Sequence, residues 1–306
     1  MLDSPLSVSL PPEELSVARR VPGGVELKFS WRHRDLLVGE RDLDALLDDA
    51  GVDAERIATV HLPPGTETRG GNVGMALTRA NRGAIATFVH SQLSCLPAAD
   101  LVAHPPKRAG YGESIPVLAS LLDITDRTIA VENTSAESAW YAPEDLGFVA
   151  VLAERYEPLS DLRLTVDSAH LPRDGRPGVT PERVDAIRER LGPDVPAVAL
   201  DFERELRDRL PDEWDPSVVE SPYFPLLASV HLAGQAVRSV HLNDPRDDGV
   251  PRLDPHADDP ALDRALAALA DRGADVVVEP DAGLREQPEE LRARVTALRD
   301  RMAAVR

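Results

Sequence analysis

The most informative residues of this 306-residue chain are histidines and carboxylates at or just after the ends of short β-branched runs. Seven side chains occupy such places: His61, His104, Glu132, Asp167, His170, His241 and Glu279. A lone histidine or carboxylate at the end of a strand commonly makes an ordinary hydrogen bond or caps a helix. Seven of them at equivalent strand ends would concentrate charge unfavourably unless cations bind there. The pattern therefore indicates a divalent-metal site built from imidazole nitrogens and carboxylate oxygens.

Eight short runs rich in valine, leucine and isoleucine alternate with helical patterns along the chain. The predicted strands are residues 6–10, 25–29, 57–62, 101–104, 128–133, 162–167, 237–242 and 275–280. One of the helical patterns, residues 180–192, starts with Thr180 and Pro181 and ends at Gly192. This alternation predicts an α/β fold, a single (β/α)8 TIM barrel, in which the carboxyl ends of the strands meet on one face. A doubly wound open sheet fits less well, because no glycine-rich phosphate loop follows the first strand.

We expect residues 1–306 to form one TIM-barrel domain. One interval is too long for the regular repeat, because more than seventy residues separate Asp167 from His241, whereas one βα unit needs about thirty. The excess predicts an insertion at about residues 193–222, between the sixth and seventh strands. Long excursions of this kind commonly decorate the active face or an oligomer contact. The sequence leaves that choice open, and it leaves the oligomeric state open as well.

The composition excludes several other classes of protein. The chain carries 53 acidic and 34 basic residues, a formal net charge of -19 and 42% hydrophobic residues, which is typical of a globular rather than a disordered protein. Its one cysteine, Cys95, can form neither an internal disulfide nor a thiolate metal cage. No apolar run reaches membrane-spanning length, and the N-terminal residues lack the pattern of a signal peptide. We therefore expect a cytoplasmic protein with no membrane partner.

The kinds of charged residue are also unusual. The chain has 31 aspartates and 22 glutamates, against 32 arginines and only two lysines, Lys28 and Lys107. Well-hydrated carboxylates with almost no lysine favour a halophilic source. An ordinary acidic protein encoded by a GC-rich genome is the alternative, and the sequence leaves both hypotheses open.

Four motifs cover the ends of the last four predicted strands. They are AVENTS at residues 130–135, TVDSAH at 165–170, SVHLND at 239–244 and VVVEP at 276–280. In this order they resemble the xylose isomerase-like TIM-barrel superfamily (AP endonuclease family 2). The resemblance to its isomerases implies that one Mn, Mg or Co ion is held by four side chains: Glu132, Asp167, His241 and Glu279. It also implies that His170 contacts a sugar or sugar phosphate, while the two glutamates move a proton between adjacent carbons.

The set of candidate ligands is more fully similar to that of endonuclease IV. That enzyme holds three zinc ions with nine side chains, and the matching residues here are His61, His104, Glu132, Asp167, His170, His241, Asp254, His256 and Glu279. This resemblance implies that Glu132 bridges two zinc ions and that a metal-bound hydroxide attacks phosphorus at an abasic site in DNA. The candidate substrate-binding residues are Trp31, Arg32, Arg34 and Asn243.

Departures from the endonuclease pattern keep two enzyme hypotheses open. The first strand carries SVSL instead of a Gly-Ala-His-Val-Ser signature, the loops that would touch DNA are changed, and no long basic stripe is present. Because all nine ligand types are present, we favour a metal-dependent, endonuclease IV-like phosphodiesterase over a single-metal sugar isomerase or epimerase. In either enzyme the catalytic residues would be Glu132, Glu279 and His170. The third hypothesis is a barrel that has lost catalysis and serves as a binding protein, and the intact set of ligands argues against it.

Overall fold

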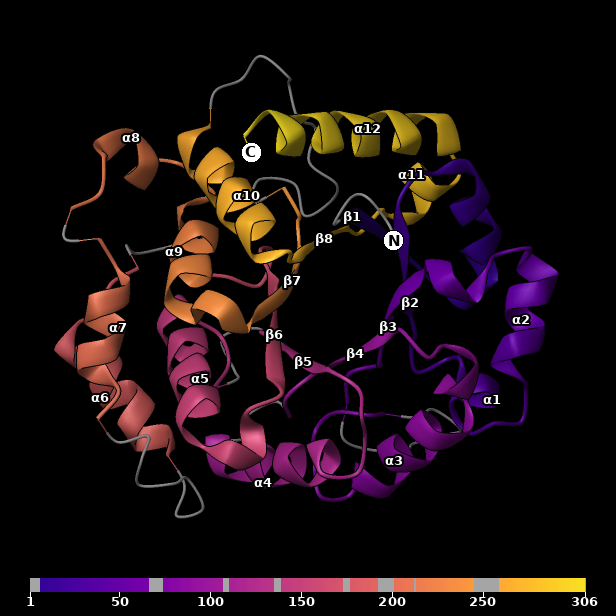
Figure 1. Cartoon of the computed structure of the whole chain (residues 1–306), viewed down its shortest axis with the longest axis horizontal. Coiled ribbons are helices and arrows are strands. Elements are labelled where there is room, and N and C mark those ends of the chain that lie inside the picture. Colours follow the sequence, from indigo (N-terminus) through magenta and orange to yellow (C-terminus); the bar gives the residue numbers. More distant parts are fainter. Residues whose placement is uncertain are drawn as a thin grey trace.

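Eight parallel strands close into a barrel in the computed structural model, in the order in which they follow one another along the chain (Figure 1). They are β1 (Leu6–Leu10), β2 (Gly24–Lys28), β3 (Ile57–His61), β4 (Asp100–Ala103), β5 (Ile129–Glu132), β6 (Leu162–Asp167), β7 (Val237–His241) and β8 (Asp275–Val278). The structure describes residues 6–65, 74–106, 110–134, 139–172, 177–191, 201–211, 213–244 and 259–305. The prediction of a single (β/α)8 TIM barrel is confirmed, and each predicted strand ends within two residues of the observed one.

Helices alternate with the strands and surround the barrel (Figure 1). They are α1 (Arg34–Leu37), α2 (Leu43–Ala50), α3 (Arg82–Ser91), α4 (Tyr111–Leu122), α5 (Pro143–Arg155), α6 (Pro181–Arg190), α7 (Glu203–Arg209), α8 (Pro216–Val219), α9 (Phe224–Ala233), α10 (Pro260–Arg272), α11 (Ala282–Arg285) and α12 (Pro288–Ala304). Short 3-10 helices add η1 (Pro12–Arg20), η2 (Ala54–Arg56), η3 (Leu93–Cys95), η4 (Glu157–Leu159) and η6 (Gly234–Ala236). None of the described helices has both the length and the apolar composition that crossing a bilayer requires.

Side chains and glycines at the helix ends explain where several helices start and stop. Thr180 caps α6, since its side chain accepts a hydrogen bond from the backbone of the third helical residue, and the predicted start of this helix is confirmed. The helix ends at Arg190, and the predicted end at Gly192 lies outside the described residues. Asp259 caps α10 in the same way, and Gly273 ends that helix with a left-handed φ of 66°.

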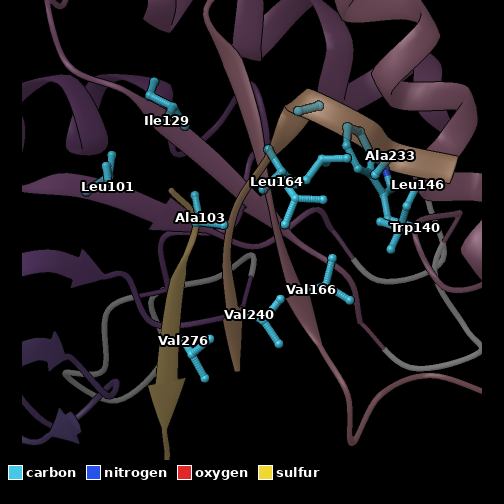
Figure 2. Packing of buried hydrophobic residues seen from close by; sticks show 14 of the residues in the cluster. Leu101, Ala103, Ile129, Trp140, Leu146, Leu164, Val166, Ala233, Val240 and Val276 are labelled. Carbon is cyan, nitrogen blue, oxygen red and sulfur yellow. The ribbon is translucent and has the colours of Figure 1, made fainter. Parts of the chain in front are cut away.

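Apolar side chains fill the space between the strands and the helices. Along each strand, side chains alternate between the barrel interior and the helical layer, as a period of two requires. Val166, Val240 and Val276 of neighbouring strands share one buried cluster with Leu146 of α5 and Ala233 of α9 (Figure 2). Complete burial of a valine or leucine stabilises the fold by about 1.5–3 kcal/mol. This layer therefore holds the strands rigidly, and with them the side chains at their ends.

The strand positions that face the barrel interior are largely polar instead. The Ser9 hydroxyl of β1 donates to Glu26 of β2 at 2.7 Å, and the hydroxyls of Thr165 and Ser239 lie 2.8 Å apart between β6 and β7. All four residues are buried. Buried polar groups need hydrogen-bond partners inside the protein. The interior of this barrel is therefore a hydrogen-bonded network of polar side chains rather than a hydrophobic core.

The long interval between β6 and β7 contains α6, α7, α8 and α9. Within the predicted insertion at residues 193–222, the structure describes α7 and α8, while residues 192–200 and 212 lie outside the described part. α9 packs against both α5 and α10, so α9 completes the ring of helices around the barrel. Figure 1 shows α6 and α7 on the outer side of α5 and α9. α6 and α7 thus form a partial outer layer on one side of the barrel, and the insertion at residues 193–222 stays a prediction.

A buried carboxylate, Asp275, lies at the start of β8, at the end of the barrel opposite the predicted metal ligands. Its Oδ2 accepts a hydrogen bond from the Ser7 hydroxyl at 2.5 Å, and its buried Oδ1 has no hydrogen-bond partner among the described residues. Burial raises the pKa of Asp275 to about 7, and the hydrogen bond from Ser7 only partly opposes this shift. The side chain therefore changes its charge near neutral pH.

We expect Asp275→Asn to gain stability relative to the wild type as the pH rises from 4 to 8. Because the folded-state pKa of about 7 lies above the unfolded value of about 3.9, the stabilisation from this group is full below pH 4 and is lost as the pH rises through 7. Asparagine keeps an oxygen for Ser7 but carries no charge, so the relative gain should reach about 1–3 kcal/mol. Denaturant unfolding at both pH values measures it, and a pH-independent difference would contradict the assignment.

Candidate metal centre

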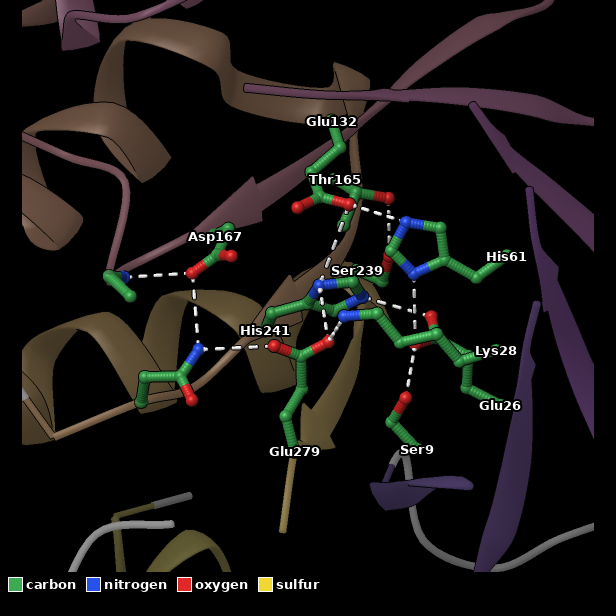
Figure 3. A network of polar contacts seen from close by, with 12 residues as sticks. Ser9, Glu26, Lys28, His61, Glu132, Thr165, Asp167, Ser239, His241 and Glu279 are labelled. Carbon is green, nitrogen blue, oxygen red and sulfur yellow. Dashed lines mark hydrogen bonds and ion pairs between the residues drawn. The ribbon is translucent and has the colours of Figure 1, made fainter. Parts of the chain in front are cut away.

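Seven of the nine predicted ligands come together at the carboxyl ends of the strands, and Figure 3 labels His61, Glu132, Asp167, His241 and Glu279 among them. They are His61, His104, Glu132, Asp167, His170, His241 and Glu279. The other two, Asp254 and His256, lie outside the described residues. Three overlapping groups have ligand atoms within 4.8 Å of one another: Glu132–Asp167–His241, His61–His104–Glu132 and Glu26–His61–His241–Glu279. The strand ends thus form one continuous cluster of imidazoles and carboxylates.

The register of the barrel explains this convergence. Asp167 at the end of β6 pairs with His241 at the end of β7, so the two side chains stand at the same level of the barrel. Lys28 at the end of β2 pairs in the same way with His61 at the end of β3. Because neighbouring parallel strands present paired residues on the same face, residues that are distant in the sequence meet at one mouth of the barrel.

Glu132 lies at the centre of the cluster. Its Oε2 is 2.8 Å from His61 Nε2, 3.3 Å from His104 Nε2 and 3.7 Å from His241 Nδ1. Its Oε1 is 3.6 Å from Nδ1 of His170, whose side chain is 39% exposed and is therefore the most exposed of the seven described candidate ligands. One buried carboxylate accordingly contacts four imidazoles, which is an arrangement suited to a ligand shared between cations or between a cation and protonated histidines.

The other two carboxylates are held in place by neighbouring side chains. Asn243 Nδ2 donates to Asp167 Oδ1 at 3.1 Å and approaches Glu279 Oε2 at 3.5 Å. The backbone N–H of Ala169 also donates to Asp167 Oδ1, at 2.8 Å. The ammonium of Lys28 pairs with Glu279 Oε1. Asn243, predicted to bind substrate, is buried and therefore acts in this structure as a bridge between two candidate ligands.

Buried polar atoms without partners show that the cluster suits a cation. Among the described residues, His241 Nδ1 and His104 Nδ1 are buried and make no hydrogen bond. Each such atom costs about 1–3 kcal/mol when it is left unpaired, and a divalent ion contacting His241 Nδ1 would relieve this cost. Mixed imidazole and carboxylate ligands suit Mn, Zn, Co or Mg. The residues present therefore fit a divalent metal: Glu132, Asp167 and His241 form one group of close ligand atoms, and Glu279 Oε1 lies 3.5 Å from Nδ1 of the same His241, so these four side chains could hold it.

Mutual charges govern the protonation of these groups. Burial lowers the pKa of His241, but the charges of Glu26, Glu279 and Glu132 outweigh burial and raise it to about 10. Burial raises the pKa of Glu132, but the charges of His61, His104 and His241 bring it well below its usual value. Asp167 differs, because burial and the charge of Glu132 both raise its pKa, to about 6. Without a cation, protonated imidazoles therefore offset the negative charge.

Two residues of β2, Glu26 and Lys28, belong to this cluster although the sequence analysis did not select them. Glu26 contacts His61 and His241 from inside the barrel, and Lys28 pairs with Glu279. The signal that could have found them is the alternation in GVELK, which places both side chains on the face opposite to Val25 and Leu27. Charged residues at alternate positions of a buried strand must point to a polar interior.

A cavity of about 490 Å³ opens beside Glu279 and is lined by thirteen residues, among them Lys28, Trp31 and Arg32. Trp31 is 44% exposed, and the guanidinium of Arg32 stacks over its ring at 4.8 Å. Arg34 was also predicted to bind substrate. It pairs with Glu40 at 2.7 Å and does not line the cavity. Trp31 and Arg32 accordingly line the cavity beside Glu279, and Arg34 does not.

Comparisons with known proteins add information on the fold. No family model and no curated protein matches this sequence. Among solved structures, the chain is similar to D-psicose 3-epimerase with D-tagatose from Clostridium cellulolyticum H10, with a TM-score of 0.52 and 13% identity over 98% of both chains. It is also similar to D-psicose 3-epimerase in the presence of D-fructose (TM-score 0.50, 12% identity, 97% and 96% of the chains) and to AsfvAP:AG (0.50, 10%, 97% and 98%). At these identities the similarity shows a shared fold.

We expect cation binding to release protons. The pKa of His241 is about 10, so at pH 7 its imidazole is positively charged and has hydrogen on both nitrogens. The nitrogen that binds a metal must lose its hydrogen. Calorimetric titration with Mn²⁺ in buffers of different ionisation enthalpy should show release of about one proton per cation and an affinity that rises from pH 6 to pH 8. Binding without proton release would contradict the assignment of His241 as a ligand.

Proposed function

We propose that this protein is a divalent-cation-dependent isomerase or epimerase of sugars or sugar phosphates. The observation that carries the proposal is the convergence of Glu132, Asp167, His241 and Glu279 at the mouth of the barrel, beside a cavity that Glu279 also lines. The fold shared with D-psicose 3-epimerase, solved with D-tagatose and with D-fructose, supports the same class of substrate. We therefore favour the sugar isomerase or epimerase, which was the alternative in the sequence analysis, over the endonuclease IV-like phosphodiesterase.

The cation and the two glutamates have different roles in the proposed reaction: the cation stabilises charge, and the glutamates transfer protons. When bound, the cation would stabilise negative charge on a carbonyl oxygen and a neighbouring hydroxyl oxygen of the substrate. Glu132 ends β5 and Glu279 follows β8, so the two carboxylates approach the centre from different strands. One of them removes a proton from the substrate carbon, and the other returns a proton. Return to the opposite face of the same carbon gives an epimer. Return to the adjacent carbon gives an isomer, provided that the hydroxyl proton also passes to the former carbonyl oxygen.

Glu279 is suited to accept the proton. Burial raises its pKa, but the charges of His241 and Lys28 outweigh burial and hold the pKa of Glu279 below its usual value. The carboxylate is therefore ionised at neutral pH. Lys28 pairs with Oε1, whereas among the described residues Oε2 has only the longer contact of 3.5 Å with Asn243. Oε2 is accordingly the oxygen that takes a proton from carbon, while Lys28 keeps the side chain in place.

The cavity beside Glu279 provides room for the substrate. Its volume of about 490 Å³ lies within the range of about 300–1,000 Å³ that small-molecule sites occupy. The exposed ring of Trp31 offers an apolar surface to the C–H groups of a sugar. The guanidinium of Arg32 offers several donors to hydroxyl or phosphate oxygens. His170, half-exposed beside Glu132, is a further candidate for substrate contact.

A phosphodiesterase acting at abasic sites in DNA is the second candidate. The additional cluster of His61, His104 and Glu132 favours it, because a single-cation isomerase does not require these two histidines as ligands. Asp254 and His256 remain proposed ligands in this alternative. The net charge of -19 opposes it, since affinity for DNA depends largely on basic contacts to phosphates.

Deuterium exchange tests the proposed function. Protein loaded with Mn²⁺, Mg²⁺ or Co²⁺ should move deuterium from D₂O onto a carbon next to the carbonyl of a ketose or ketose phosphate, as measured by NMR. Glu132→Gln and Glu279→Gln should each slow this exchange by about 10²–10⁴-fold, because each removes one proton carrier. His104→Ala is the matched control in the same cluster and should slow exchange by less than about tenfold.

An abasic DNA duplex assayed in parallel separates the two candidates. Nicking of the duplex, with no exchange into any ketose, aldose or sugar phosphate of the panel, would contradict the isomerase. In that case His104→Ala should remove nearly all nicking activity, because His104 would then hold one of several cations.

A further inference from the structure

Glu26 is fully buried inside the barrel and accepts three hydrogen bonds (Figure 3). The Ser9 hydroxyl donates to its Oε1 at 2.7 Å, and His61 Nδ1 donates to the same oxygen at 3.2 Å. His241 Nε2 donates to its Oε2 at 2.9 Å. A single carboxylate on β2 therefore connects two histidines that come from β3 and β7.

These contacts determine which nitrogen of each histidine remains for a cation. An ionised carboxylate accepts hydrogen bonds and donates none. Ser9 and His61 both approach Oε1 and His241 approaches Oε2, so both oxygens of Glu26 serve as acceptors. Hydrogen therefore sits on Nδ1 of His61 and on Nε2 of His241. The other nitrogens, His61 Nε2 and His241 Nδ1, lie 2.8 and 3.7 Å from Glu132 Oε2, on the side of the metal centre.

We propose that Glu26 is a positioning residue that orients both imidazoles at once and thereby selects Nδ1 of His241 as the cation-binding nitrogen. Nδ1 of His241 has no hydrogen-bond partner in the described part of the chain, as expected for a nitrogen that is kept for a ligand. The rings of His61 and His241 are only 5.2 Å apart, so one carboxylate can hold both. The role rests on the proposed function only in requiring that a cation binds at this centre.

His104 shows the effect of lacking such an acceptor. It stacks on His61 with ring centroids 4.8 Å apart, but its buried Nδ1 makes no hydrogen bond among the described residues. Outer carboxylates that orient metal-binding histidines raise metal affinity by about 10- to 100-fold. Glu26 orients His61 as well as His241, so of the three buried histidines His104 is the one without an outer carboxylate among the described residues.

Glu26→Gln tests this role with little change of shape. The amide oxygen can accept from one histidine, but the amide nitrogen must donate to the other, whose cation-facing nitrogen then carries the hydrogen. We expect the affinity for Mn²⁺, measured by calorimetry without substrate, to fall by about 10- to 100-fold. Asp275→Asn is the matched control, since it makes the same isosteric change at a buried carboxylate that bonds to Ser7 and to no histidine. Equal affinities in the two variants would overturn the proposal.

If the Glu26→Gln variant does not fold, a measurement on the wild-type protein still tests the proposal. Nitrogen-15 NMR of the Zn²⁺-loaded protein should show His241 bound through Nδ1 with hydrogen on Nε2, and His61 with hydrogen on Nδ1. Coordination of His241 through Nε2 would overturn the role of Glu26 while leaving the proposed function intact. A wild-type protein that binds neither Zn²⁺ nor Mn²⁺ would overturn both, so the two failures are distinguishable.

Discussion

The balance of charge among buried imidazoles and carboxylates is the constraint on which this barrel depends. Four carboxylates meet three buried histidines and one lysine within a few ångströms: Glu26, Glu132, Asp167, Glu279, His61, His104, His241 and Lys28. Unpaired, any of these charges would strongly destabilise the fold. Protons on the imidazoles offset the carboxylates when no cation is bound, as the raised pKa values of His61 and His241 show. A divalent cation can replace those protons, so the same side chains serve folding and ligand binding.

Neighbouring groups hold some of the candidate ligands in place by hydrogen bonds or ion pairs and leave another without such a contact. Asp167 receives hydrogen bonds from Asn243 and Ala169, and Glu279 is paired with Lys28. His241 has Glu26 behind it, whereas Nδ1 of His104 has no partner among the described residues. Ligands whose orientation is fixed bind metals more tightly. Asp167, His241 and Glu279 are accordingly the candidate ligands that neighbouring groups hold in place.

Much of the fold and most of the candidate ligands could be predicted from the sequence, because both follow from periodic patterns. Short β-branched runs alternating with helices predict the barrel, and polar residues at the ends of those runs must share one face. Glu26 was missed because it lies within a strand, between Val25 and Leu27, and not at the end of the strand. Its role follows from its side chain pointing into the barrel interior. The contact of Asn243 with two carboxylates depends on side-chain geometry that spacing does not determine. Substrate choice depends on the residues beyond the strand ends, whose arrangement spacing does not specify.

Anomalous diffraction from crystals soaked in Mn²⁺ tests the central claim most directly, because it locates the cation without any assumption about the reaction. We expect one strong peak within coordination distance of carboxylate oxygens of Glu132, Asp167 and Glu279 and of Nδ1 of His241. No peak among these four side chains, or a peak only between His61 and His104, would contradict the claim that they form a single metal centre.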